Sequence, residues 1–152
     1  MCGVKEIFIL MLYSLISLLN RIIPAREVFA HCDIPCGIYT VEPAQTAAQT
    51  VVKMVEKLKE ADSADVHGIS RFTAAKEEHA KICKEQLLIL WTDYFKEEHL
   101  EAFPSLHETF WKAAKLCSKV KQEVSMDSAK ELQKAVDEIA AMFSKAESSK
   151  QK

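Results

Sequence analysis

The apolar residues from position 43 onward recur at steps of three and four, and this spacing constrains the fold more than any other feature of the chain. Pro43 suits the first turn of a helix because its missing N–H has no partner there, and Glu42 lies near the positive end of the helix dipole. The spacing predicts a helix from 43 to about 61. Its buried face comprises Ala44, Ala47, Ala48, Val51, Val52, Val55 and Leu58.

Three later segments repeat this pattern after a polar loop at 62–68. The second predicted helix begins near Ser70, and its apolar face carries Phe72, Ala75, His79, Ile82, Gln86 and Ile89, broadened by Leu87, Leu88, Leu90 and Trp91. The third begins at Pro104, and its face carries Leu106, Phe110, Ala113, Ala114 and Cys117. Asp127 or Ser128 is predicted to cap the fourth, which buries Ala129, Leu132, Val136, Ile139, Ala140 and Phe143. Residues 147–152 are expected to fray.

Length and composition agree with a single helical domain. A chain of 152 residues can form one domain with a substantial core, and three glycines with four prolines leave little material for the turns of an all-β fold. We therefore predict an all-α fold, an antiparallel four-helix bundle at about 43–146. The formal net charge of -2 gives no reason to expect a nucleic-acid partner.

The first thirty residues differ in character from the rest. Residues 7–19 form an uncharged run, IFILMLYSLISLL, and small residues at Val28 and Ala30 are typical of a cleavage site after Ala30. We predict a signal or pro-peptide at 1–30, removed by a maturation peptidase. The run is shorter than the roughly 20 residues that a spanning helix needs, although an uncleaved membrane anchor is the alternative.

This prediction implies an exported or secreted product, in a periplasm, an extracellular space or an organelle lumen. A cytoplasmic protein with a cleaved pro-peptide is the alternative. After cleavage we expect no stable association with a membrane. The mature domain is then 31–152.

Three potential metal ligands, His31, Cys32 and Cys36, follow the predicted cut within six residues. Cleavage gives His31 a free α-amine beside its imidazole, so that one residue offers two nitrogen ligands. Cys32 adds a thiolate and a backbone amide nitrogen, and Cys36 adds a second thiolate. The predicted hook at 31–39 is irregular and precedes the first helix.

Such donors favour a flat four-coordinate site. Zinc prefers tetrahedral closure by four side chains, whereas square-planar coordination with thiolates suits Ni(II) or Cu(II). Anionic donors also stabilise a higher oxidation state, which indicates a redox role. Two alternatives remain open from the residues alone. Cys32 and Cys36 could form a disulfide, with each other or with Cys83 or Cys117, or the segment could bind copper or nickel without catalysis.

Two sequence runs carry a resemblance to a known family. The run HCDIPCGIY at 31–39 resembles the amino-terminal hook of the nickel superoxide dismutases, and LWTDYFK at 90–96 resembles a second motif of that family. A weaker similarity continues through FPSLHETFWKAAKLC to about Phe143. The resemblance implies a four-helix bundle that assembles as a homohexamer, a trimmed precursor and one nickel ion per subunit. The implied reaction converts superoxide to oxygen and hydrogen peroxide, through Ni(II) and Ni(III).

The resemblance also implies the ligands. Nickel would be bound by the amine of His31, the amide nitrogen and sulfur of Cys32 and the sulfur of Cys36, with the His31 imidazole as axial ligand. Pro35 would be the cis proline that shapes the hook. The amide of Asp33, with that of Cys36, would face the path of approach.

Outside the ligands, the resemblance implies that Tyr39 and Tyr94 limit access and order water, and that Lys96 attracts the anionic substrate. Gln49 and His79 stand where family members often have a glutamate and some have an arginine, so we expect the support of the axial histidine to differ.

Read without the family, several of these residues have simpler interpretations. Tyr94 and Trp91 are typical packing aromatics, and His67, His99 and His107 are typical surface or core histidines. Cys83 and Cys117 are predicted to be buried free thiols, with a disulfide as the minority case. The charged run at 76–81 is predicted to be solvated. Two other functions stay open: a secreted four-helix interaction protein with a disulfide-closed loop, and a nickel or copper carrier.

Overall fold

The computed structural model describes residues 11–13 and 38–150. The chain divides into two units, Met1–His31 and Cys32–Lys152. In the first unit the described residues Met11, Leu12 and Tyr13 are helical and exposed. Among the helices that the structure describes, none is long and apolar enough to cross a membrane.

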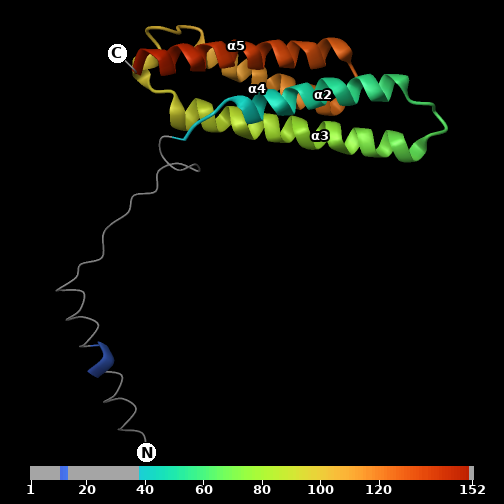
Figure 1. The fold of residues 1–152 in the computed structure, drawn as a ribbon, viewed down its shortest axis with the longest axis horizontal. Helices are drawn as coiled ribbons and strands as arrows, with labels where there is room; N and C mark the ends of the chain where they lie inside the picture. The colour runs from blue at the N-terminus through green and yellow to red at the C-terminus, as the bar shows by residue number, and fades with distance from the viewer. Residues whose placement is uncertain (1–10, 14–37, 151–152) are drawn as a thin grey trace, which may run out of the picture. The chain divides into compact units, whose positions relative to one another are not determined.

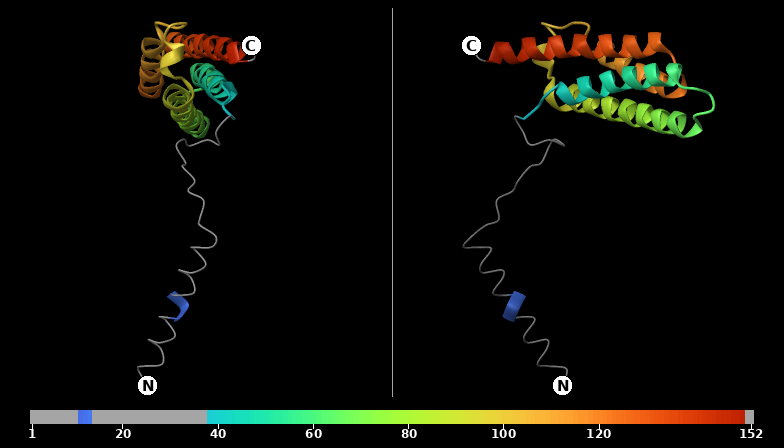
Figure 2. Two further views of the ribbon diagram at one scale, coloured as in Figure 1. Left: turned by 90° about the vertical axis from the view of Figure 1, so that its left-hand side faces the viewer. Right: turned by 45° about the vertical axis from the view of Figure 1, so that its right-hand side comes forward.

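Four long helices form most of the described part of the second unit: α2 (Glu42–Glu60), α3 (Val66–Ile89), α4 (Leu106–Gln122) and α5 (Met126–Lys150). They alternate in direction, and the chain between α3 and α4 crosses the end of the bundle at which α2 begins (Figure 1). α2 packs on α3 and α5, and α4 packs on the same two helices. A view close to the helix axes shows the four helices around a common core (Figure 2). The predicted all-α antiparallel four-helix bundle is confirmed.

The core confirms most of the predicted faces, but the face of α3 lies one residue further along. On α2 the predicted alanines and valines are buried, with Val52 and Leu58 at the margin. On α3 the predicted Phe72, Ala75, His79, Ile82, Gln86 and Ile89 are only half-buried, and the buried line is Lys76, Ala80, Cys83, Leu87 and Leu90. Leu87, Leu90 and Cys83 of this line were predicted to be apolar or buried, but Lys76 and Ala80 were missed, because a lysine is not expected in a buried line.

α3 begins at Val66, four residues before the predicted start at Ser70. The cap is Asp65, whose side chain accepts a hydrogen bond from the main-chain N–H of Gly68 at 2.8 Å. Gly68 was expected to lie in a loop, but it belongs to the first turn. A Cβ at this position would stand 2.1 Å from an Asp65 carboxylate oxygen, so the glycine lets the cap close over it.

The limits of α4 and α5 also differ from the prediction. α4 begins at Leu106, because Pro104 lies in the preceding turn. α5 begins at Met126, and its capping side chain is Ser125, which accepts from the main-chain N–H of Ser128 at 3.3 Å. The predicted cap at Asp127 or Ser128 was therefore wrong by two or three residues. The predicted fraying from residue 147 was also wrong, since α5 continues to Lys150.

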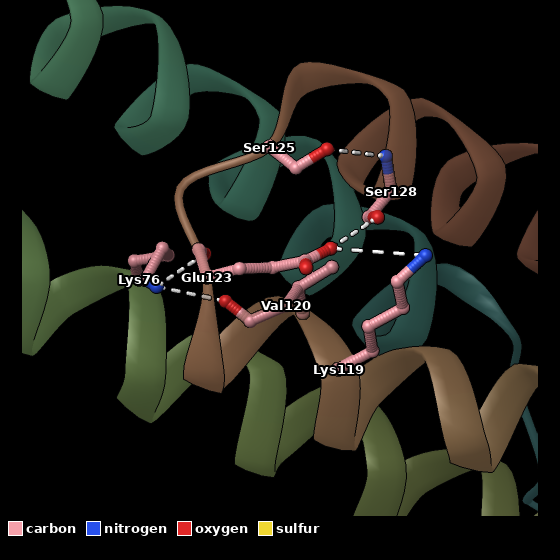
Figure 3. A network of polar contacts seen from close by, with 6 residues as sticks. All are labelled: Lys76, Lys119, Val120, Glu123, Ser125 and Ser128. Carbon is pink, nitrogen blue, oxygen red and sulfur yellow. Dashed lines mark hydrogen bonds and ion pairs between the residues drawn. The ribbon is translucent and has the colours of Figure 1, made fainter.

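A buried lysine ties α3 to the end of α4 (Figure 3). The Lys76 ammonium donates to the main-chain carbonyls of Val120, Lys121 and Glu123 at 2.8, 3.2 and 2.9 Å. Carbonyls at a helix C-terminus have no partners within the helix, and they carry partial negative charge. Lys76 is only 2% exposed, so the prediction that the whole run at 76–81 is solvated was wrong here.

The Glu123 side chain extends this network to α5. It accepts a hydrogen bond from the Ser128 hydroxyl and lies 3.8 Å from the Lys119 ammonium (Figure 3). The turn between α4 and α5 is thus held by polar contacts from three helices.

Cys83 and Cys117 are fully buried free thiols on α3 and α4, as predicted. The two thiols interact, and the hydrogen bond with Cys117, followed by burial, raises the pKa of Cys83. For Cys117 the hydrogen bond from Cys83 lowers the pKa and outweighs burial, and the nearby charges of Lys84 and Lys121 lower it further. The second unit therefore holds a dithiol pair inside its core.

Candidate metal centre

The predicted ligands His31, Cys32 and Cys36 lie outside the described residues, as do Asp33 and Pro35. The description of the second unit begins at Ile38. Within 11–13 and 38–150, no three His, Cys, Asp or Glu side chains gather as a metal site.

The structure brings together the two tyrosines that were predicted to lie beside the hook. Tyr39 precedes α2, and Tyr94 ends the segment after α3, which is 55 positions later in the sequence. Their ring centroids are 5.6 Å apart in an edge-to-face arrangement with an interplanar angle of 62°. Tyr94 is 4% exposed and Tyr39 is half-buried. Tyr39, the last residue of the predicted hook, therefore packs against Tyr94.

A π-helical turn, η1 (Leu90–Tyr94), places the Tyr94 ring. The main-chain N–H of Phe95 donates to the carbonyl of Leu90 at 3.0 Å, one residue further back than in an α-helix. The wider turn lets Leu90, Tyr94 and Phe95 all be buried. Nothing in the apolar spacing indicated this turn.

Tyr94 stands in a cluster of aromatic rings at this end of the bundle. The rings of Phe95, His99 and Phe143 lie 4.9, 5.8 and 4.5 Å from it. His99 is stacked at 14° and is 8% exposed, so the core interpretation of this histidine is correct. Its Nδ1 accepts from the main-chain N–H of Lys96 at 2.9 Å, which leaves the proton of the neutral ring on Nε2.

The Tyr94 hydroxyl reaches a carboxylate on α5. It donates to Oε1 of Glu147 at 2.5 Å, a length typical of a charge-assisted O–H···O⁻ bond. Burial raises the pKa of Tyr94, and the hydrogen bond and negative charge of Glu147 raise it further. The phenol is therefore protonated at neutral pH. The sequence analysis missed Glu147, because residues 147–152 were expected to be a frayed end of the last helix.

The chain is similar to proteins of one known family, both in sequence and in structure. Residues 26–147 match the family model described as nickel-containing superoxide dismutase. The superoxide dismutase (Ni) of Streptomyces seoulensis is 42% identical over 117 residues, which are 77% of this chain and 86% of that protein. That of Streptomyces coelicolor is 40% identical with the same coverage. The chain belongs to the nickel-containing superoxide dismutase family.

Solved structures agree. The native structure of a nickel superoxide dismutase has a TM-score of 0.72 and 30% sequence identity, and the match covers 78% of this chain and 99% of that one. A nickel-containing superoxide dismutase with its nickel ligation in the oxidized state gives the same TM-score at 32% identity. The protein is thus an oxidoreductase with a nickel cofactor, as the two sequence motifs predicted.

Lys96, which was predicted to attract the anionic substrate, is exposed. It precedes the short 3-10 helix η2 (Glu97–His99) and lines a surface cleft of about 470 Å³ with Trp91, Phe95, Glu97, Leu100, Leu106 and His107. Trp91 donates to Nδ1 of His107 at 2.8 Å and stacks on Phe110. Trp91 therefore has the packing role that was predicted for it.

The two residues that were expected to differ from the family pattern, Gln49 and His79, lie on the long helices. Gln49 is exposed on α2. His79 is half-buried on α3, and its Nδ1 is 2.8 Å from the Ala75 carbonyl one turn earlier, so Nδ1–H donates there. The His79 ring is thus oriented by its own helix.

Proposed function

We propose that the mature protein begins at His31 and dismutes superoxide at a nickel ion held by His31, Cys32 and Cys36. The match of the family model at 26–147, which includes these three residues and Tyr94, carries the proposal. The donors fit the metal, since thiolates and nitrogen ligands in a planar set suit nickel. Bound nickel would supply one-electron redox chemistry between Ni(II) and Ni(III), which the conversion of two superoxide ions and two protons to oxygen and hydrogen peroxide needs.

Position along the chain supports a site beside the tyrosines. Cys36 is three residues before Tyr39, and a fully extended chain spans at most about 3.6 Å per residue, or about 11 Å here. Tyr39 in turn contacts Tyr94. The Cα atom of Cys36 can therefore be no more than about 11 Å from that of Tyr39, which supports a metal site near the tyrosine pair.

The residues around the hook then have separate tasks. Tyr39 and Tyr94 form an aromatic wall that limits entry to small molecules and excludes bulk water. On the family resemblance, the main-chain amides of Asp33 and Cys36 would face the path of approach. Lys96 adds positive charge, which raises the rate of encounter with a small anion.

The decisive experiment compares two forms of the protein. Protein beginning at His31 should bind one nickel ion per chain and remove superoxide, whereas protein with one extra residue before His31 should do neither, because the amine becomes an amide. Nickel content and superoxide removal are measured on both. Equal activity of the two forms contradicts the amine ligand. Nickel binding without turnover indicates a carrier.

A second comparison tests the thiolates. Cys36→Ser in the mature form should lose nickel and activity but keep the helical circular dichroism, since residue 36 precedes α2. Thr40→Ala, an exposed change just beyond the hook, is the matched control. A disulfide between Cys32 and Cys36 in the nickel-loaded protein, found by mass spectrometry, contradicts the proposal.

We infer that the mature chain assembles as a homohexamer, on the family resemblance alone, and light scattering of the purified protein measures its mass. Exposed large apolar side chains at Ile38, Val66, Trp111 and Val124 offer surfaces for such contacts.

We also infer that the protein is exported and that a peptidase removes residues 1–30. Amino-terminal sequencing of protein from each cell fraction checks the cut and the compartment, and a cut product in the cytoplasm alone favours the pro-peptide alternative.

A further inference from the structure

The contact between Tyr94 and Glu147 joins the segment after α3 to the last turns of α5. The two residues are 53 positions apart, and their side chains are partly buried. Phe143, one turn before Glu147, packs on the same tyrosine ring at 4.5 Å. α5 therefore fixes both the plane of the ring and the direction of its hydroxyl.

This hydrogen bond determines what the hydroxyl can do for other groups. A phenol has one proton and an oxygen that accepts hydrogen bonds. When the proton is committed to the Glu147 carboxylate, the oxygen can only accept from a water or an N–H group elsewhere. Tyr94 then positions groups that donate hydrogen bonds to its oxygen, and it does not donate a hydrogen bond toward the hook.

We propose that Glu147 is a positioning residue, which holds the Tyr94 proton so that the tyrosine oxygen serves the nickel hook solely as a hydrogen-bond acceptor. This inference rests on the proposed function, because it assigns Tyr94 to the surroundings of that site. It adds Glu147 to the residues on which the reaction depends.

The packing around Tyr94 restricts the motion of its ring. A ring packed on four neighbours, Tyr39, Phe95, His99 and Phe143, has little freedom to rotate its plane. The C–O–H torsion is the remaining freedom, and Glu147 removes it. Without the carboxylate the O–H group can rotate and donate in other directions, so that the tyrosine oxygen no longer acts only as an acceptor.

The first test reads the hydrogen bond directly. In ultraviolet resonance Raman spectra, the intensity ratio of the tyrosine Fermi doublet reports whether a phenol donates or accepts. Subtracting the spectrum of Tyr94→Phe isolates Tyr94 from the other tyrosines. We expect a strong-donor signature in wild type, a weaker one in Glu147→Gln and its loss in Glu147→Leu. The measurement is made on the full chain and on nickel-loaded protein beginning at His31.

The second test measures kcat/KM for superoxide in the same nickel-loaded variants, together with nickel content. Glu147→Leu should lose about tenfold in kcat/KM with nickel content unchanged, and Glu147→Gln should retain an intermediate value because its amide oxygen still accepts. Glu138→Gln, an exposed carboxylate on the same helix, is the matched control and should equal wild type.

A Raman ratio that is the same in wild type and both Glu147 variants overturns the proposal, and so does a changed ratio with unchanged kcat/KM. If Glu147→Leu does not fold, Glu147→Gln carries both criteria alone. Wild-type protein that is inactive with nickel bound instead defeats the proposed function, and the Raman result on the full chain still shows whether Tyr94 donates to Glu147.

Discussion

The Lys76 ammonium on α3 donates a 2.8 Å hydrogen bond to the main-chain carbonyl of Val120 near the end of α4. Two further carbonyls share the same ammonium. Burial lowers the pKa of Lys76, while the charge of Glu77 and Glu123 opposes that shift. The three carbonyls favour the charged form as well, so the ammonium acts as a buried cap for α4.

We expect Lys76→Met to destabilise the protein by about 3 kcal/mol, because it leaves the carbonyls at the end of α4 without their donor while its length still fills the space. Urea unfolding measures the change. Lys81→Met, at an exposed position on the same helix, is the control and should change stability by less than about 0.5 kcal/mol. Equal effects of the two substitutions contradict the capping role.

The two core thiols should be reduced and unreactive in the folded protein. In a variant that begins at His31 and carries Cys32→Ser and Cys36→Ser, Cys83 and Cys117 are the remaining cysteines. A thiol reagent should label neither in buffer and both in urea, since both side chains are fully buried. Rapid labelling without urea, or a missing pair of thiols after unfolding, contradicts this expectation.

Tyr94 should make stability fall as the pH rises above about 10. Burial first, and Glu147 second, raise the folded-state pKa of Tyr94 above its ordinary value. The folded state therefore holds this proton where the unfolded state releases it, so the contribution to stability is complete below the unfolded pKa and declines above it. Unfolding in urea across this range should show a smaller decline for Tyr94→Phe than for wild type. Parallel curves would show that Tyr94 does not contribute.

Lys96 should act on the rate of encounter. We expect Lys96→Met to lower kcat/KM by about threefold and to flatten its dependence on ionic strength, because one positive charge near the path of the anion is removed. Steady-state kinetics over a salt series measures both effects. Lys134→Met, an exposed lysine on α5, is the control. A salt dependence equal to that of wild type rules out steering by Lys96.

The helices were predictable because helical spacing is a local property. A separation of about one helical turn between apolar residues indicates a buried face, as for Val51 and Val55 on α2 or Leu132 and Val136 on α5. The starts of α3 and α5 were missed because Asp65 and Ser125 act as caps, and capping depends on local backbone geometry that apolar spacing does not report. The π-helical turn η1, which ends at Tyr94, was also missed, because apolar spacing does not show which carbonyl a main-chain N–H will bond to.

The sequence alone indicated the family and its nickel chemistry through the runs HCDIPCGIY and LWTDYFK, and it predicts that His31, Cys32 and Cys36 bind the metal once a proteolytic cut frees the amine of His31. It also determined that Tyr39 and Tyr94 belong to the family's motifs. Only the tertiary structure decided that Lys76 is buried and donates to the main-chain carbonyl of Val120, and that Glu147 accepts a hydrogen bond from the Tyr94 hydroxyl. Those pairs lie 44 and 53 positions apart, and no local periodicity encodes which side chains meet when four helices pack.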